Sequence, residues 1–397
     1  MANQELPLIP TNRTCPFHPP SEYKQLRIEQ PISKVQTTRG DTAWLVTKYK
    51  DIITVLSDHR FSSDPRTLGF PTYITGNVPP PPGFFLQADD PDHKRLRRAV
   101  TKEFLSVYVD TLRPKMQQVF DNILDDVLKM TPPVDLVKVL TVPAASQIIC
   151  ELLGVSLEEY PLVREATEII LDVGRSAEET EVAAINLMGY FDQLVIAKKV
   201  SPTDDLLSNL IKEAGQNGQP NHEELVGLAA LLLLSGYDTV SLVMGLGIVT
   251  LLQHPDQLAS FLADPSLATA LVDELVRYVS INHAGLPRAA TADVEVGGQL
   301  IRAGEGVVVM VNSGNRDESA FENPDSFDIH RKERNHVGFG HGIHKCLGIH
   351  FAYAELEIAF LTLFCRIPDL RLATNIENLS FRHEMVLYGL KTLPVTW

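Results

Sequence analysis

The sequence predicts a mainly α-helical protein with a smaller β part, an α+β fold. From about residue 92 onward, apolar residues recur at intervals of three and four, which is the period of an amphipathic helix. Strand-like stretches lie toward both ends, at about 25–50, 282–312 and 380–397. Since no internal repeat, Gly/Ser linker or shift in composition divides the chain, we expect a single domain over residues 1–397.

The first strand-like stretches, at 31–38 and 42–47, are joined by a turn with the sequence RGD. Helices are expected at 90–105, 108–130, 203–214 and 264–280, and one more follows Cys346. Strands return over 292–311, where glycines interrupt them. The closing stretch, 384–397, is predicted to form a terminal hairpin.

Residues 225–252 are apolar enough and long enough to span a membrane. However, Ser235, Tyr237, Asp238 and Thr239 lie together near the middle of this segment, where a charge is most costly in lipid. We therefore predict a buried central helix and no membrane anchor.

The composition narrows the choice of partner and compartment. The net charge is −15 at pH 7, so a nucleic-acid phosphate backbone is not expected as a partner. The four cysteines show no paired spacing, as is typical of reduced thiols in the cytoplasm. The N-terminus has no basic stretch followed by an apolar one, so no signal peptide is predicted.

The stretch GFGHGIHKCLG, residues 338–348, combines one cysteine with two histidines and many glycines. A structural zinc site needs four ligands, usually in two closely spaced pairs, and no second pair lies nearby. A lone cysteine suits haem iron better, because the porphyrin supplies four ligands itself. Gly340 and Gly342 can adopt positive φ and lie close to a flat ring. We expect Cys346 to open the next helix, whose free N–H groups and dipole lower the thiol pKa.

The stretch FGHGIHKCLG resembles the Phe-Gly-x-Gly-x-His-x-Cys-x-Gly signature of the cytochrome P-450 family at every specified position. The resemblance extends over essentially the whole chain. It implies a triangular, helix-rich domain around a buried haem b, with Cys346 as the axial iron ligand and Phe339, Gly340 and Gly348 against the cofactor. It also implies insertion of one oxygen atom from O2 into an organic substrate.

The Glu-x-x-Arg motif of the family is similar to Glu274 and Arg277 here. Arg331 resembles the second arginine of that network. Taken alone, Glu274 and Arg277 would be read as a surface ion pair of little energetic value. The resemblance instead implies a buried structural network behind the cysteine loop.

The middle of the apolar segment, SGYDTV, resembles the acid–alcohol motif of the family. Ser235, Asp238 and Thr239 stand at i, i+3 and i+4, and we expect them to share one helix face. The resemblance implies that Thr239 hydrogen-bonds dioxygen and that Asp238 relays protons. Gly236 costs about 1 kcal/mol of helix stability relative to alanine, which close approach of the cofactor would offset. The alternative is a polar stripe packed against a neighbouring helix.

Four basic residues resemble the haem propionate partners of the family. His93 and Arg97 stand at i and i+4 near a helix start, Arg288 follows the Glu-x-x-Arg helix, and His344 lies in the cysteine loop. Each alone would more often be a solvated charge.

Substrate and partner sites are expected from family positions. The pocket roof would be formed by 65–86, 284–286 and 385–387. The candidate pocket residues are Phe84, Phe85, Ser235, Leu286, Met385 and Val386. Basic residues around the cysteine side would dock an acidic ferredoxin, served by a ferredoxin reductase, or another electron donor; these are Lys94, Arg95, Arg98, Lys102 and Lys345.

These observations favour a haem-thiolate monooxygenase that acts on a small apolar organic molecule, in secondary-metabolite tailoring or xenobiotic oxidation. Some stretches also resemble the fungal nitric oxide reductase branch of the family, against which Asp238 argues. A haem-binding gas sensor without turnover is the third hypothesis, and the intact Asp238–Thr239 pair argues against it.

Overall fold

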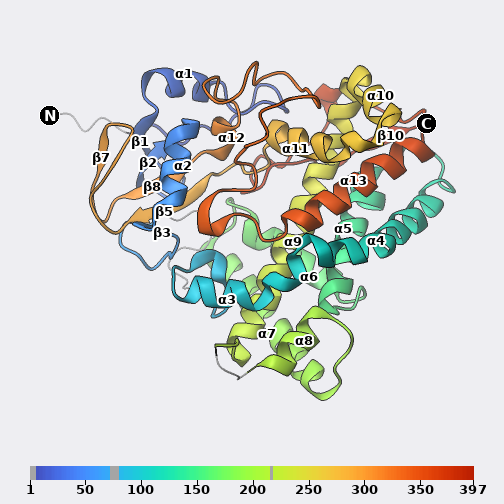
Figure 1. The fold of residues 1–397 in the computed structure, drawn as a ribbon, viewed down its shortest axis with the longest axis horizontal. Coiled ribbons are helices and arrows are strands. Elements are labelled where there is room, and N and C mark those ends of the chain that lie inside the picture. Colours follow the sequence, from blue (N-terminus) through green and yellow to red (C-terminus); the bar gives the residue numbers. More distant parts are fainter. Residues whose placement is uncertain (1–5, 72–79, 215–217) are drawn as a thin grey trace.

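The computed structural model describes residues 6–71, 80–214 and 218–397. Most of the labelled strands and the N-terminus gather at one corner of a roughly triangular molecule, helices fill most of the rest, and the last strand lies beside the C-terminus on the opposite side (Figure 1). The helices are α1 Glu22–Glu29, α2 Tyr49–Ser57, α3 Asp92–Val100, α4 Ser106–Val127, α5 Val142–Leu153, α6 Tyr160–Leu171, α7 Ala177–Val200, α8 Leu206–Glu213, α9 His222–Gln253, α10 Pro255–Ala263, α11 Ala268–Val279, α12 Val311–Gly314 and α13 Ile349–Arg366.

Helix α9 is the apolar segment that the sequence singled out. It begins with a capping box, in which Asn221 and Glu224 each accept a hydrogen bond from the other's backbone N–H. It packs against α5, α7, α11 and α13, and 78% of its most apolar window is buried inside the protein. The prediction of a buried central helix is confirmed.

Within the described residues the strands form three sheets, of five, three and two strands. The strands are β1 Ile32–Gln36, β2 Thr42–Val46, β3 Phe61–Ser62, β4 Val134–Asp135, β5 Leu286–Ala290, β6 Val294–Val296, β7 Gln299–Ile301, β8 Gly306–Val309, β9 Arg371–Leu372 and β10 Pro394–Thr396. A five-stranded sheet has the order β1-β2-β8-β5-β3, so it joins two of the three predicted β regions, 25–50 and 282–312. Strand β8 pairs with β2 in parallel and with β5 antiparallel.

The chain end differs from the predicted hairpin. Residues 380–391 turn back on themselves, with a bridge between Phe381 and Leu390. The last strand, β10, instead pairs with β4 and β9, which lie far away in the sequence. Local alternation cannot distinguish a hairpin partner from a distant one, because both bury the same face of the strand.

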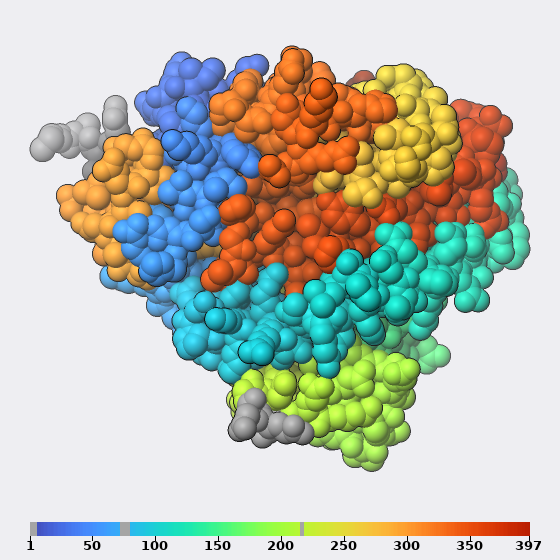
Figure 2. All heavy atoms as spheres, in the orientation of Figure 1, coloured from blue at the N-terminus to red at the C-terminus, as the bar shows by residue number. Residues whose placement is uncertain are grey.

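The segment before α13 reaches the molecular surface between the blue N-terminal region and the cyan helices α3 and α4 (Figure 2). Gly342 lies against the Leu56 carbonyl of α2, and Arg97 of α3 donates a hydrogen bond to the Lys345 carbonyl at 2.6 Å. The cysteine loop is therefore held from both sides by N-terminal helices.

Candidate functional site

The cysteine loop is a tight backbone structure. The Cys346 N–H donates to the Phe339 carbonyl at 2.9 Å, and the Gly340 N–H donates to Val337 at 2.9 Å. Gly340 and Gly342 both have φ of 71°, as the sequence predicted. A Cβ on Gly342 would overlap the Leu56 carbonyl oxygen. The missing side chain of Gly342 therefore makes room for α2, and not for a flat cofactor ring.

Cys346 stands before the helix rather than at its first turn. Helix α13 begins at Ile349 with Gly348 as its N-cap, so the expectation that Cys346 opens the helix is wrong. Burial raises the thiol pKa, although the Gly348 N–H and the charges of Arg97 and Lys345 act in the opposite direction. The groups around Cys346 therefore do not lower its pKa in this structure, contrary to the expectation.

Cys346 faces a mostly apolar cavity of about 330 Å³. Helices α5, α9 and α13 and the cysteine loop supply most of its walls. Phe339, Gly340 and Gly348 line it, as do Gly236, Ser235 and Thr239 of α9. A single sulfur ligand in such a cavity is suited to a flat apolar cofactor with its own metal ligands.

The four predicted propionate partners gather near the cysteine loop. The rings of His93 and His344 lie 4.3 Å apart, and each has a buried Nε2 without a hydrogen-bond partner among the described residues. Burial, together with the charges of Arg288, His93 and Arg97, lowers the pKa of His344 to about 3. Burial also lowers the pKa of Arg288 to about 10, while Asp89 opposes this weakly. Two unpartnered imidazole nitrogens lie near two guanidinium groups that form no ion pair within the described residues, so this cluster fits the carboxylates of haem.

Gly236 has a second role that the sequence did not reveal. It lines the cavity, but a Cβ on it would lie 2.7 Å from the Cδ1 of Ile149 in α5. Because Gly236 has no side chain, α5 can pack close to α9, and Ile149 lies at the cavity wall. The same absence leaves room for a cofactor.

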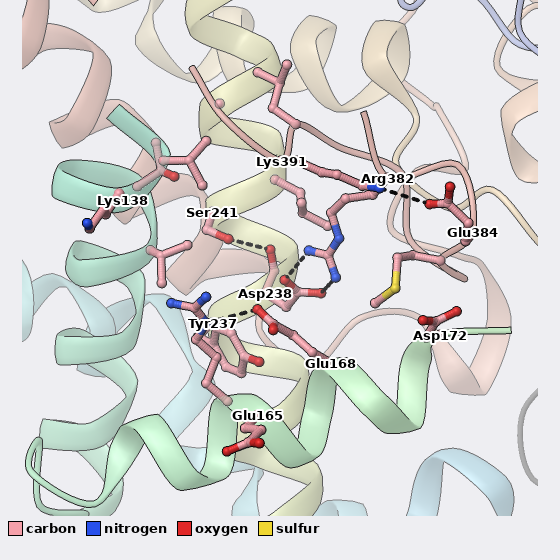
Figure 3. A pocket seen from close by; sticks show the side chains of 18 of the residues that line it. Lys138, Glu165, Glu168, Asp172, Tyr237, Asp238, Ser241, Arg382, Glu384 and Lys391 are labelled. Atoms are coloured by element: carbon pink, nitrogen blue, oxygen red, sulfur yellow. Dashed lines mark hydrogen bonds and ion pairs between the residues drawn. The ribbon is translucent and has the colours of Figure 1, made fainter. Parts of the chain in front are cut away.

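Asp238 does not share the face of Ser235 and Thr239. Its carboxylate accepts hydrogen bonds from Arg382 at 2.7 and 3.3 Å, and it lines a second cavity of about 790 Å³ on the other side of α9 (Figure 3). The reason is helix geometry: at about 100° per residue, Asp238 and Thr239 point about 100° apart. The expectation of one shared face is therefore wrong, and the backbone of α9 separates the acid from the cavity of the alcohol.

The chain is similar to known proteins over nearly its whole length. A model of the cytochrome P450 family matches residues 187–366. Pentalenic acid synthase from Streptomyces avermitilis is 41% identical over 98% of this chain and 97% of its own. Cytochrome P450 55A3 from Fusarium lichenicola is 37% identical over 99% and 98%. The crystal structure of CYP105P1 in complex with filipin I superposes with a TM-score of 0.94 at 39% identity, covering 99% of both chains.

The chain belongs to the cytochrome P450 family. As a P450 it is a haem-dependent monooxygenase with the helix-rich fold of that family.

The Glu274 network of this P450 is fully buried. Arg277 donates two hydrogen bonds to the Glu274 carboxylate at 2.7 Å each, and Arg331 adds two more at 3.1 and 3.2 Å. Arg277 also donates to the Asn315 carbonyl, and Asn315 accepts from the Val337 N–H at the start of the cysteine loop. The three predicted residues thus meet directly behind the loop.

The candidate substrate residues divide between several places. Phe85, Ser235 and Leu286 line the cavity of Cys346. Met385 lines the second cavity instead. Phe84 packs against the hydrophobic core, and the Val386 carbonyl accepts from the N–H groups of His283 and Ala284. Residues 72–79 of the predicted roof lie outside the described residues.

Leu387, at the end of the predicted roof segment 385–387, lines the cavity of Cys346. Two residues were not predicted from the sequence: Glu355, which lines the same cavity, and Arg382, which lines the second one. One oxygen of Glu355 is buried without a partner, and burial raises its pKa well above the usual range. A signal was available for Glu355, since it is an acidic residue among apolar neighbours in the helix that follows the cysteine. Arg382 had no local signal, because its partner lies 144 residues away.

Proposed function

We propose that this P450 uses haem b to hydroxylate a small apolar molecule, in secondary-metabolite tailoring or xenobiotic oxidation. The observation that carries the proposal is Cys346 in an apolar cavity that also contains the Thr239 hydroxyl. The likeness to pentalenic acid synthase and to the CYP105P1–filipin complex supports this substrate class. We also propose a cytoplasmic enzyme in which the whole chain acts as one domain.

The protein's own part in the reaction is to hold the cofactor and to supply protons. Cys346 would hold the haem, which would supply the activation of O2 for transfer of one oxygen atom to the substrate. His93, Arg97, Arg288 and His344 would hold the propionates. Thr239 would supply the hydroxyl at the cavity wall once it leaves the Ser235 carbonyl, to which its Oγ1 donates at 2.8 Å in this structure. Asp238 would take protons from solvent in the second cavity and return them toward Thr239.

Electrons would come from a ferredoxin and its reductase, or from another separate donor. Two of the five predicted docking residues are already paired, Arg95 with Glu224 and Lys102 with Glu213. Lys94, Arg98 and Lys345 are exposed and have no ion pair within the described part of the chain. These three cations beside the cysteine loop support docking of an acidic partner.

Binding of CO to the reduced protein tests the cofactor assignment. The expected result is the absorption band of a thiolate–haem–CO complex, which Cys346→Ala should abolish. A band typical of a neutral thiol or histidine complex in the wild-type chain would overturn the proposal.

Thr239→Ala tests the role of the hydroxyl. Haem content should not change, while product formed per electron falls at least about tenfold and peroxide rises, because proton delivery is slowed. Ser235→Ala, on the same cavity wall, is the matched control and should leave coupling unchanged. Equal coupling in the wild type and Thr239→Ala would remove Thr239 from the mechanism.

A nitric oxide reductase-type activity is the second candidate. It is favoured by the orientation of Asp238 away from the cavity and by the likeness to the Fusarium lichenicola protein. Consumption of nitric oxide with NADH and no protein partner would establish it. A gas sensor is the remaining alternative, and product formation with a surrogate ferredoxin system would exclude it.

A further inference from the structure

Two glycines meet where the chain before α3 crosses helix α9. A Cβ on Gly227 of α9 would overlap the Pro82 carbonyl oxygen and would lie 3.5 Å from the Gly83 Cα. A Cβ on Gly83 would overlap the carbonyl oxygen of Glu224. Gly83 also has φ of 88°, which other residues rarely adopt. Each glycine therefore lets the backbone of the other segment approach to a distance that a side chain would prevent.

This crossing lies immediately before two residues of the cavity wall. The Phe85 N–H donates to the Gly83 carbonyl at 2.9 Å, which makes a tight turn after the crossing. Phe85 and Leu86 then line the cavity, and the edge of the Phe85 ring contacts His93 with centroids 6.0 Å apart. The distance between the crossing and α9 thus determines how far these two side chains reach into the cavity.

The helix side of this contact is held firmly. Glu224 caps α9 with Asn221 and forms an ion pair with Arg95 of α3. Gly227 lies in the interior of a helix that is buried on almost every side. If the contact is widened, the segment at Pro82 and Gly83 is the part that must move, by about 1 Å or more, because backbone atoms cannot swing aside as a side chain can.

We propose that the contact between Gly83 and Gly227 is a specificity determinant of this P450. It fixes the depth of Phe85 and Leu86 in the cavity and thereby the size of ligand that fits beside the haem. The inference rests on the proposed function in requiring haem in this cavity.

Binding of two azoles of different size tests the proposal without any turnover. Imidazole reports access to the iron alone, and 4-phenylimidazole adds a ring that must contact the cavity wall. Kd values come from the shift of the haem absorption band. In Gly227→Ala, the ratio of the 4-phenylimidazole Kd to the imidazole Kd should rise at least fivefold, because Phe85 and Leu86 withdraw from the ring. The imidazole Kd itself should stay within twofold.

Gly245→Ala is the matched control, since a Cβ there lies 3.6 Å from the Cδ1 of Leu390, an ordinary contact in the same helix. It should leave the ratio unchanged and raise Tm, because alanine favours a helix over glycine. A ratio within twofold of wild type in Gly227→Ala would overturn the inference alone. Absence of the thiolate–CO band in the wild-type chain would overturn the proposed function and this inference with it.

Leu86→Ala decides the matter where Gly227→Ala does not accumulate with haem, because half of Leu86 is exposed and its truncation places no new atom against α9. The same rise in the ratio is expected, from lost contact with the phenyl ring. An unchanged ratio would show that this segment does not reach the ligand and would overturn the proposal.

Discussion

Arg382 is the residue through which Asp238 is held in the second cavity. Asp238 is 5% exposed, and the two hydrogen bonds from Arg382 compensate its buried charge. Removal of one partner from such a pair leaves the other charge uncompensated, which is far more costly than the pair itself is stabilising. A role for Asp238 in proton delivery therefore depends on Arg382.

Arg382→Met is expected to lower the product formed per electron at least about tenfold and to raise peroxide, in line with the loss of an acid–base group. In an Asp238→Asn background, Arg382→Met should not lower the product formed per electron any further, because the carboxylate through which Arg382 acts is absent. Coupling is measured from product, peroxide and electron donor consumed.

Lys391→Met is the control for this cycle, because Lys391 lines the same cavity but pairs with the exposed Glu384 at 3.2 Å. It should leave coupling unchanged, and Arg382→Lys should restore part of it. Additive effects of Arg382→Met and Asp238→Asn would show that Arg382 does not act through Asp238.

At the scale of elements, the sequence predicted most of what local pattern can specify. The strands at 31–38 and 42–47 became β1 and β2, and the apolar segment became α9. The signature located Cys346 and His344, and the family resemblance singled out His93 and Arg97, which lie beside the cysteine loop in the structure. Two predictions were wrong. The direction in which Asp238 points from the axis of α9 was wrong, and β10 was expected to pair within the terminal segment.

The Glu274 network is the element that fixes the cysteine loop, and it makes a prediction. Glu274→Gln should destabilise the protein by about 3–5 kcal/mol and reduce haem content, because it leaves two buried arginines without their carboxylate. Urea unfolding and the haem-to-protein ratio measure the two effects.

Glu168→Gln is the comparison for that variant. Glu168 accepts from the exposed Arg164 at 2.9 Å, in an i, i+4 pair on α6. Such a pair contributes about 0.3–0.5 kcal/mol, so stability and haem content should hardly change. Equal losses in the two variants would contradict the structural role of Glu274.

At the scale of the whole molecule, both ends of the chain meet behind the haem cavity. The Arg13 guanidinium lies 3.9 Å from the centre of the Tyr388 ring and donates to the Ser280 carbonyl. His283 also lies beside Tyr388, with the two ring centres 5.6 Å apart. Ser280 lines the cavity, so the N-terminal segment supports a wall of the site that it does not itself reach.

His283 makes the stability of this assembly depend on pH. Both of its ring nitrogens are buried without partners among the described residues, and burial, with the charges of Arg13 and His383, lowers its pKa to about 3. An unfolded histidine titrates near pH 6.5, so below that pH the unfolded state binds a proton that the folded state refuses. The free energy of unfolding should therefore fall as the pH drops from 6.5 toward 3, by about 2 kcal/mol from this residue between pH 7.5 and pH 5.

In His283→Phe, which keeps a ring beside Tyr388, urea unfolding at the two pH values should show a loss smaller by that amount. His59→Gln, at an exposed histidine, should keep the wild-type dependence, and an unchanged dependence in His283→Phe would show that His283 accepts a proton within the folded protein.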